Sequence, residues 1–165
     1  MPIAVVRDFV NTTDHETGVD LITTRAELAR YLGTTARAST DDLALALRLR
    51  AGLRTALTHH HDGDTAPVPA LASALTELPV SLGWTADGPA LRTSAGGVRG
   101  ALAQIGIAVH EAAAEGTWWR LKICALDECE WAFYDHSKNQ SRHWCEYGCG
   151  NKVKTRAYRA RQRTG

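Results

Sequence analysis

Four cysteines provide the clearest candidate for chemistry in this sequence, and all of them fall within one short segment. Four residues separate Cys124 from Cys129, three separate Cys145 from Cys149, and fifteen separate the two pairs. Two close pairs of thiolates, joined by a segment that can fold back as a hairpin, supply the four ligands of a tetrahedral zinc ion. The spacing therefore predicts a structural Zn2+ site in which all four cysteines are ligands.

The residues around the second pair also suit a metal site. Gly148 and Gly150 flank Cys149, so the backbone can bend at the ligand. The residues that follow favour a helix, whose N-terminal dipole stabilises anionic thiolates. With the first pair on a knuckle and a strand near residues 131–134, the segment predicts a treble-clef-like finger. A zinc ribbon, which has two knuckles and no helix, is the alternative.

Two disulfides, or four unrelated buried cysteines, are the alternatives to zinc. The first six residues lead directly to Arg7 and Asp8 without the long apolar region of a secretory signal, so we expect a cytoplasmic protein. Disulfides are rare in that reducing compartment. Unrelated core cysteines have no reason to fall in two close pairs, so zinc is the favoured interpretation. No apolar run approaches the length of a membrane span, so no membrane partner is expected.

The cysteine segment resembles the CGNR zinc finger. The resemblance rests on the runs WC at residues 144–145 and CGNK at residues 149–152, with Lys152 in place of the usual arginine. His143 stands where this family more often has arginine. The finger pattern is also matched by WAFYD at residues 131–135, SKN at 137–139 and SR at 141–142.

The N-terminal end resembles the ABATE domain, which usually precedes this finger. The run DFVNT at residues 8–12 is similar to the opening motif of that domain. Taken with the finger, the resemblance implies a bacterial regulator of transcription that is induced by stress.

Positive charge is concentrated at the C-terminal end. The net charge is +1, but residues 1–135 contain 11 basic and 17 acidic residues, a balance of −6. Residues 136–165 contain eight basic residues and one acid, Glu146. A basic end on an acidic body favours contact with a polyanion, or docking on the body itself. The candidate nucleic-acid-binding residues are Lys138, Arg142, Lys152, Lys154, Arg156, Arg159, Arg161 and Arg163.

The last of these basic residues fit one helix. Steps of four, three and four place Lys152, Arg156, Arg159 and Arg163 on one face, with no acidic residue after Glu146 to balance them. A separate small apolar face, predicted to pack, consists of Val153, Ala157 and Ala160. Such a helix can lie against DNA phosphates or enter a groove. DNA is the expected partner, and a solvated or docked basic tail is the alternative.

The first 116 residues predict a mostly helical domain. Residues 3–10 are rich in β-branched side chains and predict a strand. Capping patterns at Thr24 and Ser39 predict helices over residues 25–32 and 40–58, and apolar periodicity predicts further helices over 68–78 and 98–115. Asp87-Gly88 predicts the turn of a β-hairpin over residues 80–93. The fold class is thus α+β, with a mostly helical ABATE-like domain at 1–116 and a zinc finger with a basic C-terminal helix at 117–165.

Two polar segments of the helical domain are candidates for binding. Asn11 and Thr12 are a candidate small-ligand pocket, although turn hydrogen bonds are the simpler role. The run HHHD at residues 59–62 raises a metal hypothesis. Consecutive side chains point in different directions, so the run predicts a solvated loop instead.

An enzyme is the main rival to a DNA-binding regulator. Four cysteine ligands close the zinc shell, whereas a catalytic zinc keeps an open position for water. If a histidine replaced one cysteine, the acid–base candidates would be Asp135, His136, His143 and Glu146. No nucleophile–base motif or phosphate loop occurs elsewhere, so no catalytic residue is assigned. A protein-interaction module is a third interpretation, and a helical domain with a pocket would suit a regulator that senses a small ligand.

Overall fold

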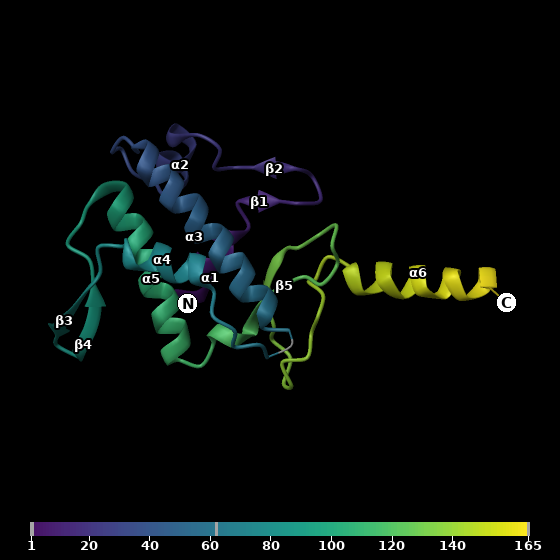
Figure 1. The fold of residues 1–165 in the computed structure, drawn as a ribbon. Coiled ribbons are helices and arrows are strands. Elements are labelled where there is room, and N and C mark those ends of the chain that lie inside the picture. Colours follow the sequence, from purple (N-terminus) through teal and green to yellow (C-terminus); the bar gives the residue numbers. More distant parts are fainter. Residues whose placement is uncertain (1, 62, 165) are drawn as a thin grey trace.

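The structure is a computed structural model that describes residues 2–61 and 63–164. A helical body carries small two-stranded antiparallel sheets, and one long helix, α6, projects away from it (Figure 1). The predicted α+β class is confirmed. None of the described helices is long and apolar enough to cross a membrane. In chain order the elements are α1 (Pro2–Val10), β1 (Thr13–Asp14), β2 (Val19–Asp20), α2 (Arg25–Tyr31), α3 (Thr40–His59), α4 (Pro69–Thr76), β3 (Ser81–Thr85), β4 (Gly88–Arg92), α5 (Gly97–Ala114), the 3-10 turn η1 (Trp118–Arg120), β5 (Leu121–Ile123), β6 (Ala132–Tyr134) and α6 (Cys149–Thr164).

The N-terminal segment is a helix, so the predicted strand over residues 3–10 is wrong. α1 buries Ile3, Val6, Phe9 and Val10, whose spacing of three or four residues puts them on one helical face. That face packs against α5 and α3. The β-branched composition favoured a strand, but local propensity is a weak preference that tertiary packing overrides.

Side-chain caps fix the starts of α2 and α3, as their sequences predict. The Thr24 hydroxyl accepts from the Glu27 N–H at 3.2 Å, and the Glu27 carboxylate accepts from the Thr24 N–H at 2.8 Å. Ser39 and Asp42 form the same reciprocal pair before α3. A β-carbon at Gly52 of α3 would lie 2.8 Å from the Cα of Leu71, so glycine allows α4 to approach α3 closely.

The hydrophobic core extends from the helices into the β5–β6 hairpin. Leu121, Ile123 and Ala132 belong to the same buried cluster as the inner faces of α1, α3 and α5. A second, smaller cluster surrounds the four cysteines and includes Leu126 and Phe133. The hairpin therefore has one end in the body and the other at the cysteines. The predicted β3–β4 hairpin is also present, but its two turn residues are Ala86 and Asp87, one position earlier than predicted, because Gly88, with a φ of +112°, already pairs with Thr85 as the first residue of β4.

Candidate functional site

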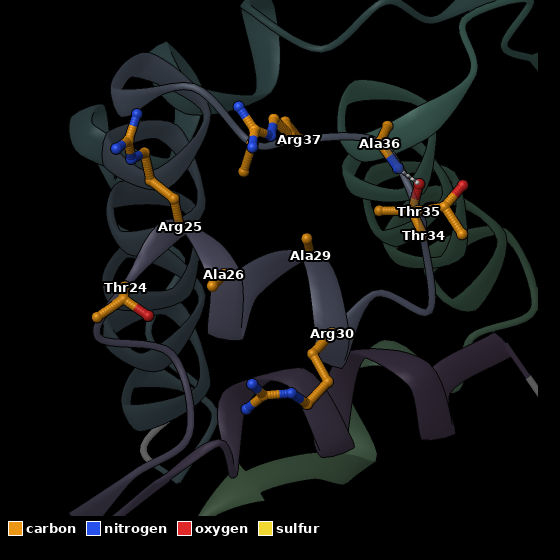
Figure 2. Close-up of a pocket in the computed structure, with 10 residues that line it drawn as sticks. Thr24, Arg25, Ala26, Ala29, Arg30, Thr34, Thr35, Ala36 and Arg37 are labelled. Carbon is orange, nitrogen blue, oxygen red and sulfur yellow. Dashed lines mark hydrogen bonds between the residues drawn. The ribbon is translucent and has the colours of Figure 1, made fainter.

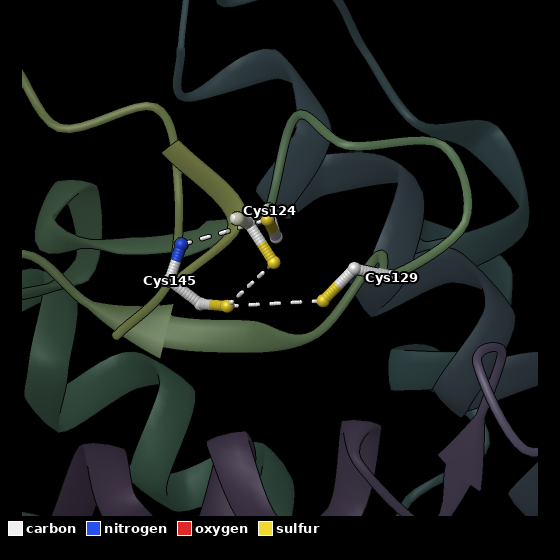
Figure 3. Close-up of side chains that lie close together, drawn as sticks. Cys124, Cys129 and Cys145 are labelled. Carbon is white, nitrogen blue, oxygen red and sulfur yellow. Dashed lines mark hydrogen bonds between the residues drawn. The ribbon is translucent and has the colours of Figure 1, made fainter. Parts of the chain in front are cut away.

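The four cysteines come together from two short segments, residues 124–129 and 145–149. Cys124 directly follows β5, Cys129 lies on the turn after it, Cys145 lies in the loop after β6, and Cys149 opens α6. All four are buried, and their Sγ atoms lie within 4.8 Å of one another. The Cys145 Sγ lies 3.7 Å from the Cys129 Sγ and 3.5 Å from the Cys149 Sγ (Figure 3). Zn–S bonds of about 2.3 Å in a tetrahedron require sulfurs about 3.8 Å apart, so the cluster fits zinc.

The thiols are free rather than paired as disulfides, since a disulfide holds its sulfurs about 2 Å apart. Burial raises the pKa of the Cys129 thiol, and it raises the pKa of Cys149 to about 11. Burial acts on Cys124 as well, but hydrogen bonds from the backbone N–H groups of Cys145 and Leu126 outweigh it and lower the pKa of that thiol. Binding of a metal must therefore displace protons from this buried site.

A buried ion pair holds together the part of the chain that leads to Cys145. The Asp135 carboxylate is fully buried and accepts hydrogen bonds from Lys122 Nζ at 3.1 Å and from the Arg142 N–H at 2.9 Å. It also accepts from the N–H and the hydroxyl of Ser137, at 2.9 and 2.6 Å. Burial alone would raise the pKa of Asp135, but the Ser137 bonds and the other donors outweigh burial and lower it to about 2. Lys122 also donates to the carbonyl of Gln140. Asp135 thus ties β5 and β6 to the loop before Cys145.

Polar side chains of the body also hold the hairpin. The Asn11 amide donates to the Ala132 carbonyl at 2.9 Å and accepts from the Ala132 N–H at 2.8 Å. Arg54 of α3 donates to the carbonyl of Glu130 at 2.7 Å. Thr12 is buried, and its hydroxyl donates to the Phe9 carbonyl and accepts from Arg50. Asn11 borders a cavity of about 360 Å³. Both side chains thus have structural partners, and a small-ligand role for Asn11 and Thr12 stays a prediction.

Models of known families match most of the chain. Residues 4–119 match the ABATE family, described as "Putative stress-induced transcription regulator", and residues 120–162 match the CGNR zinc finger. The chain belongs to the ABATE family. Among curated proteins, no match to it was found. The CGNR match and the clustered cysteines together indicate a metal-binding finger, for which zinc is the fitting ion.

The histidines at the end of α3 join the ABATE part to the CGNR finger, so the predicted solvated loop is wrong. His60 is buried between the rings of Trp118 and Trp119, and its Nδ1 bonds the Leu121 carbonyl at 2.6 Å. Burial lowers the pKa of His60 to about 4, so Nδ1–H of the neutral ring is the donor. His61 bonds the Ile123 carbonyl through Nε2. Asp62 lies outside the described residues. Within those residues, the cysteine quartet is the cluster that can hold a metal.

The acid–base candidates of the CGNR finger do not all meet at one place, although His136 and Glu146 border the same cavity as Asn11, and His143 and Glu146 border a second one. Asp135 is buried in its ion pair, and His143 stacks on His61 with ring centroids 5.2 Å apart. Glu146 pairs with Arg142 at 3.5 Å, and His136 packs on the Tyr134 ring. Each of the four side chains thus has a structural partner.

The basic helix α6 starts at Cys149 and then leaves the body (Figure 1). Basic side chains of its first turns form ion pairs. Lys152 Nζ lies 2.8 Å from the Glu16 carboxylate, and the Arg156 guanidinium donates two 2.9 Å hydrogen bonds to Glu128. The expectation that these charges lack local balance is therefore wrong. Glu16 and Glu128 are far away in the sequence, on the β1–β2 turn and the turn between Cys124 and Cys129.

The outer turns of α6 are exposed. Arg159 and Arg163 have no ion pair in the described part of the chain. Of the predicted apolar face, Val153 packs against the cysteine cluster, but Ala157 and Ala160 are exposed. That part of the prediction is wrong because the helix projects beyond any surface on which it could pack. Lys138 and Lys154 are also exposed.

Proposed function

We propose that this ABATE protein is a regulator of transcription that binds DNA through α6 of its CGNR finger. The observation that supports the proposal is the projecting basic helix itself. It contains no acidic residue from Cys149 to Thr164. Its charged side chains are Lys152, Lys154, Arg156, Arg159, Arg161 and Arg163. Positive charge clustered along a helix next to a zinc site is typical of contact with nucleic-acid phosphates.

The metal centre serves this role by fixing where α6 starts and in which direction it runs. Four thiolates close the coordination shell of zinc, so the ion supplies folding free energy and no open position for chemistry. Cys149 is both a ligand and the first residue of α6. The Glu16–Lys152 and Glu128–Arg156 pairs then hold the first turns of α6. Arg159 and Arg163, on the same face but without an ion pair in the described chain, are available to bind DNA phosphates.

The test is a comparison of two double variants with the same change of charge. Arg159→Ala/Arg163→Ala removes the two outer arginines of the main face. Lys154→Ala/Arg161→Ala removes two charges away from that face. Binding to a random-sequence DNA duplex, measured by fluorescence anisotropy against salt concentration, should lose about two units of slope in the first variant, one for each phosphate contact. The second variant should lose less.

Two results would contradict the proposal. Wild-type affinity and slope in a folded Arg159→Ala/Arg163→Ala protein would refute DNA binding by α6. Equal losses in both variants would refute contact through one face.

The acidic partners of α6 give an independent test. If Arg156 exchanges Glu128 for a phosphate, Glu128→Gln removes a competitor for its guanidinium. An exposed ion pair contributes roughly 0–1 kcal/mol, so DNA affinity should rise by up to about five-fold. If the pair instead keeps α6 in a docked state unrelated to DNA, the affinity will not change.

The ABATE part is the proposed sensor of a small ligand, which would give the regulator its signal. The expected location is the cytoplasm, since four free thiols are kept reduced there. Release of the protein from DNA by a small molecule that binds the ABATE part would support the sensing role. DNA affinity that no such ligand alters would count against it.

A further inference from the structure

The ABATE part contains a positively charged hollow beside α2 (Figure 2). It measures about 650 Å³, and it lies between α2 and the loop that follows it, residues 34–38. Its charged lining residues are Arg25, Arg30 and Arg37, and none of its lining residues is acidic. Small-molecule sites occupy roughly 300–1,000 Å³, so the hollow has the size of a ligand site.

The three arginines lack a carboxylate partner, unlike most arginines of the helical body. Arg48 pairs with Glu77, Arg50 with Asp20, and Arg99 with Asp42. By contrast, the side chains of Arg25, Arg30 and Arg37 have no hydrogen bond or ion pair within the described residues. All three are exposed. Three unbalanced cations around one hollow stand out on a body whose charge balance is −6 over residues 1–135.

The remaining lining residues indicate the size and polarity of the ligand. Figure 2 shows Arg25 and Arg37 on one side of the hollow and Arg30 on the other, with Ala29 between them. Three of the four lining alanines, Ala26, Ala29 and Ala36, present small apolar surfaces. The Thr34 hydroxyl accepts from the Ala36 N–H at 3.1 Å, so its own hydrogen is left to donate. The hollow therefore offers both positively charged side chains and apolar surface to a ligand.

We propose that this hollow binds a small organic phosphate. Guanidinium groups bind phosphate oxygens through two parallel hydrogen bonds. A phosphate monoester carries about −1.5 to −2 charges at pH 7, which matches several arginines better than one carboxylate does. The alanines would contact the organic part of the ligand. The inference rests on the sensing role proposed for the ABATE part and does not depend on DNA binding by α6.

The experiment uses three aromatic probes that differ in charge. Phenyl phosphate, benzoate and benzamide are titrated calorimetrically into the zinc-loaded full chain at constant ionic strength. Phenyl phosphate should bind most tightly, benzoate more weakly, and neutral benzamide not measurably. Arg25→Ala and Arg37→Ala should each weaken phenyl phosphate binding at least five-fold.

Arg92→Ala is the matched control. Arg92 on β4 is an exposed arginine without an ion pair in the described chain, so its removal changes the charge equally outside the hollow. Its effect should stay within two-fold. The proposal is overturned if phenyl phosphate does not bind, if benzamide binds equally well, or if Arg92→Ala weakens binding as much as Arg25→Ala.

DNA phosphates are the other source of the same chemistry, and the α6 variant separates the two. Arg159→Ala/Arg163→Ala should bind phenyl phosphate like the wild type. If Arg25→Ala and Arg37→Ala weaken binding of duplex DNA while phenyl phosphate does not bind, the arginines are DNA contacts and the hollow is no ligand site. If phenyl phosphate binds but neither the wild type nor any variant binds DNA, the proposed DNA-binding function is refuted and the proposed phosphate site is supported.

Discussion

Replacing Asp135 with asparagine should strongly destabilise the CGNR finger. The Asp135 carboxylate is fully buried and accepts four hydrogen bonds, from Lys122, from Arg142 and twice from Ser137. Asparagine keeps the shape but turns one acceptor oxygen into a donor that faces other donors. It also removes the counter-ion of Lys122, whose side chain is 3% exposed.

Two estimates bound the loss of stability. The pKa of Asp135 is lowered from 3.8 to about 2, so folding stabilises the ionised form over the neutral one by about 2 kcal/mol. Leaving the partner of a buried ion pair uncompensated typically costs roughly 3–5 kcal/mol. We expect a loss between about 2 and 5 kcal/mol at neutral pH. In the wild type, the contribution of Asp135 is complete above the unfolded pKa near 3.8 and is lost as the pH falls towards about 2.

The assay is urea unfolding of the zinc-loaded protein, followed by tryptophan fluorescence, to which Trp131 and Trp144 beside the cysteine cluster contribute. Asp127→Asn is the matched control, because Asp127 is an exposed carboxylate of the same finger without a partner among the described residues. It should change stability by less than about 0.5 kcal/mol. Lys122→Met/Asp135→Asn should recover part of the loss, since it removes the uncompensated ammonium as well. Equal stability of Asp135→Asn and Asp127→Asn would refute the argument.

Three further predictions concern the junction of the ABATE part with the finger. Burial lowers the pKa of His60 from 6.5 to about 4, so the wild type should lose stability as the pH falls through this range, by about 2 kcal/mol at pH 5. His60→Asn keeps a donor to Leu121 but cannot titrate, so parallel pH profiles of the two proteins would contradict this. Because Leu121, Ile123 and Ala132 lie in the main core, removal of zinc with a chelator should lower the melting temperature of the helical body while most helical circular dichroism remains. An unchanged melting temperature would show that the hairpin holds without metal. Asn11→Ala removes two hydrogen bonds to Ala132 and should cost about 2 kcal/mol in denaturant unfolding, and Gln104→Ala on the exposed side of α5 should cost almost nothing.

The clustering of the four cysteines could be predicted from the sequence because the residues that determine it are close together in the chain. Each cysteine pair lies within one turn, and the helix that starts at Cys149 carries its own signals. The caps at Thr24 and Ser39 and the presence of the β3–β4 hairpin were predictable for the same reason, although its turn lies one residue earlier than Asp87-Gly88.

The features that escaped prediction depend on partners far along the chain. His60 and His61 bond carbonyls of β5, about sixty residues away, so their sequence suggested only a polar loop. Likewise, Glu16 reaches Lys152 across 136 residues. α1 has an apolar repeat of three and four residues that fits a helix, but its β-branched residues pointed to a strand, and contact with α5 decides between them.

The projection of α6 separates the two opposite charges of the molecule. Residues 1–135 carry a balance of −6, and this charge repels phosphates. A helix of 16 residues extends about 24 Å. The Debye length at physiological ionic strength is about 8 Å, so the field of the body fades well before the last turn of α6. A polyanion at the outer turns therefore experiences the charge of the helix and little of the charge of the body. A protein with an acidic body can in this way attract a polyanion without neutralising the surface of that body. At 0.01 M ionic strength the Debye length grows to about 30 Å, so the body should then repel a polyanion at the outer turns more strongly.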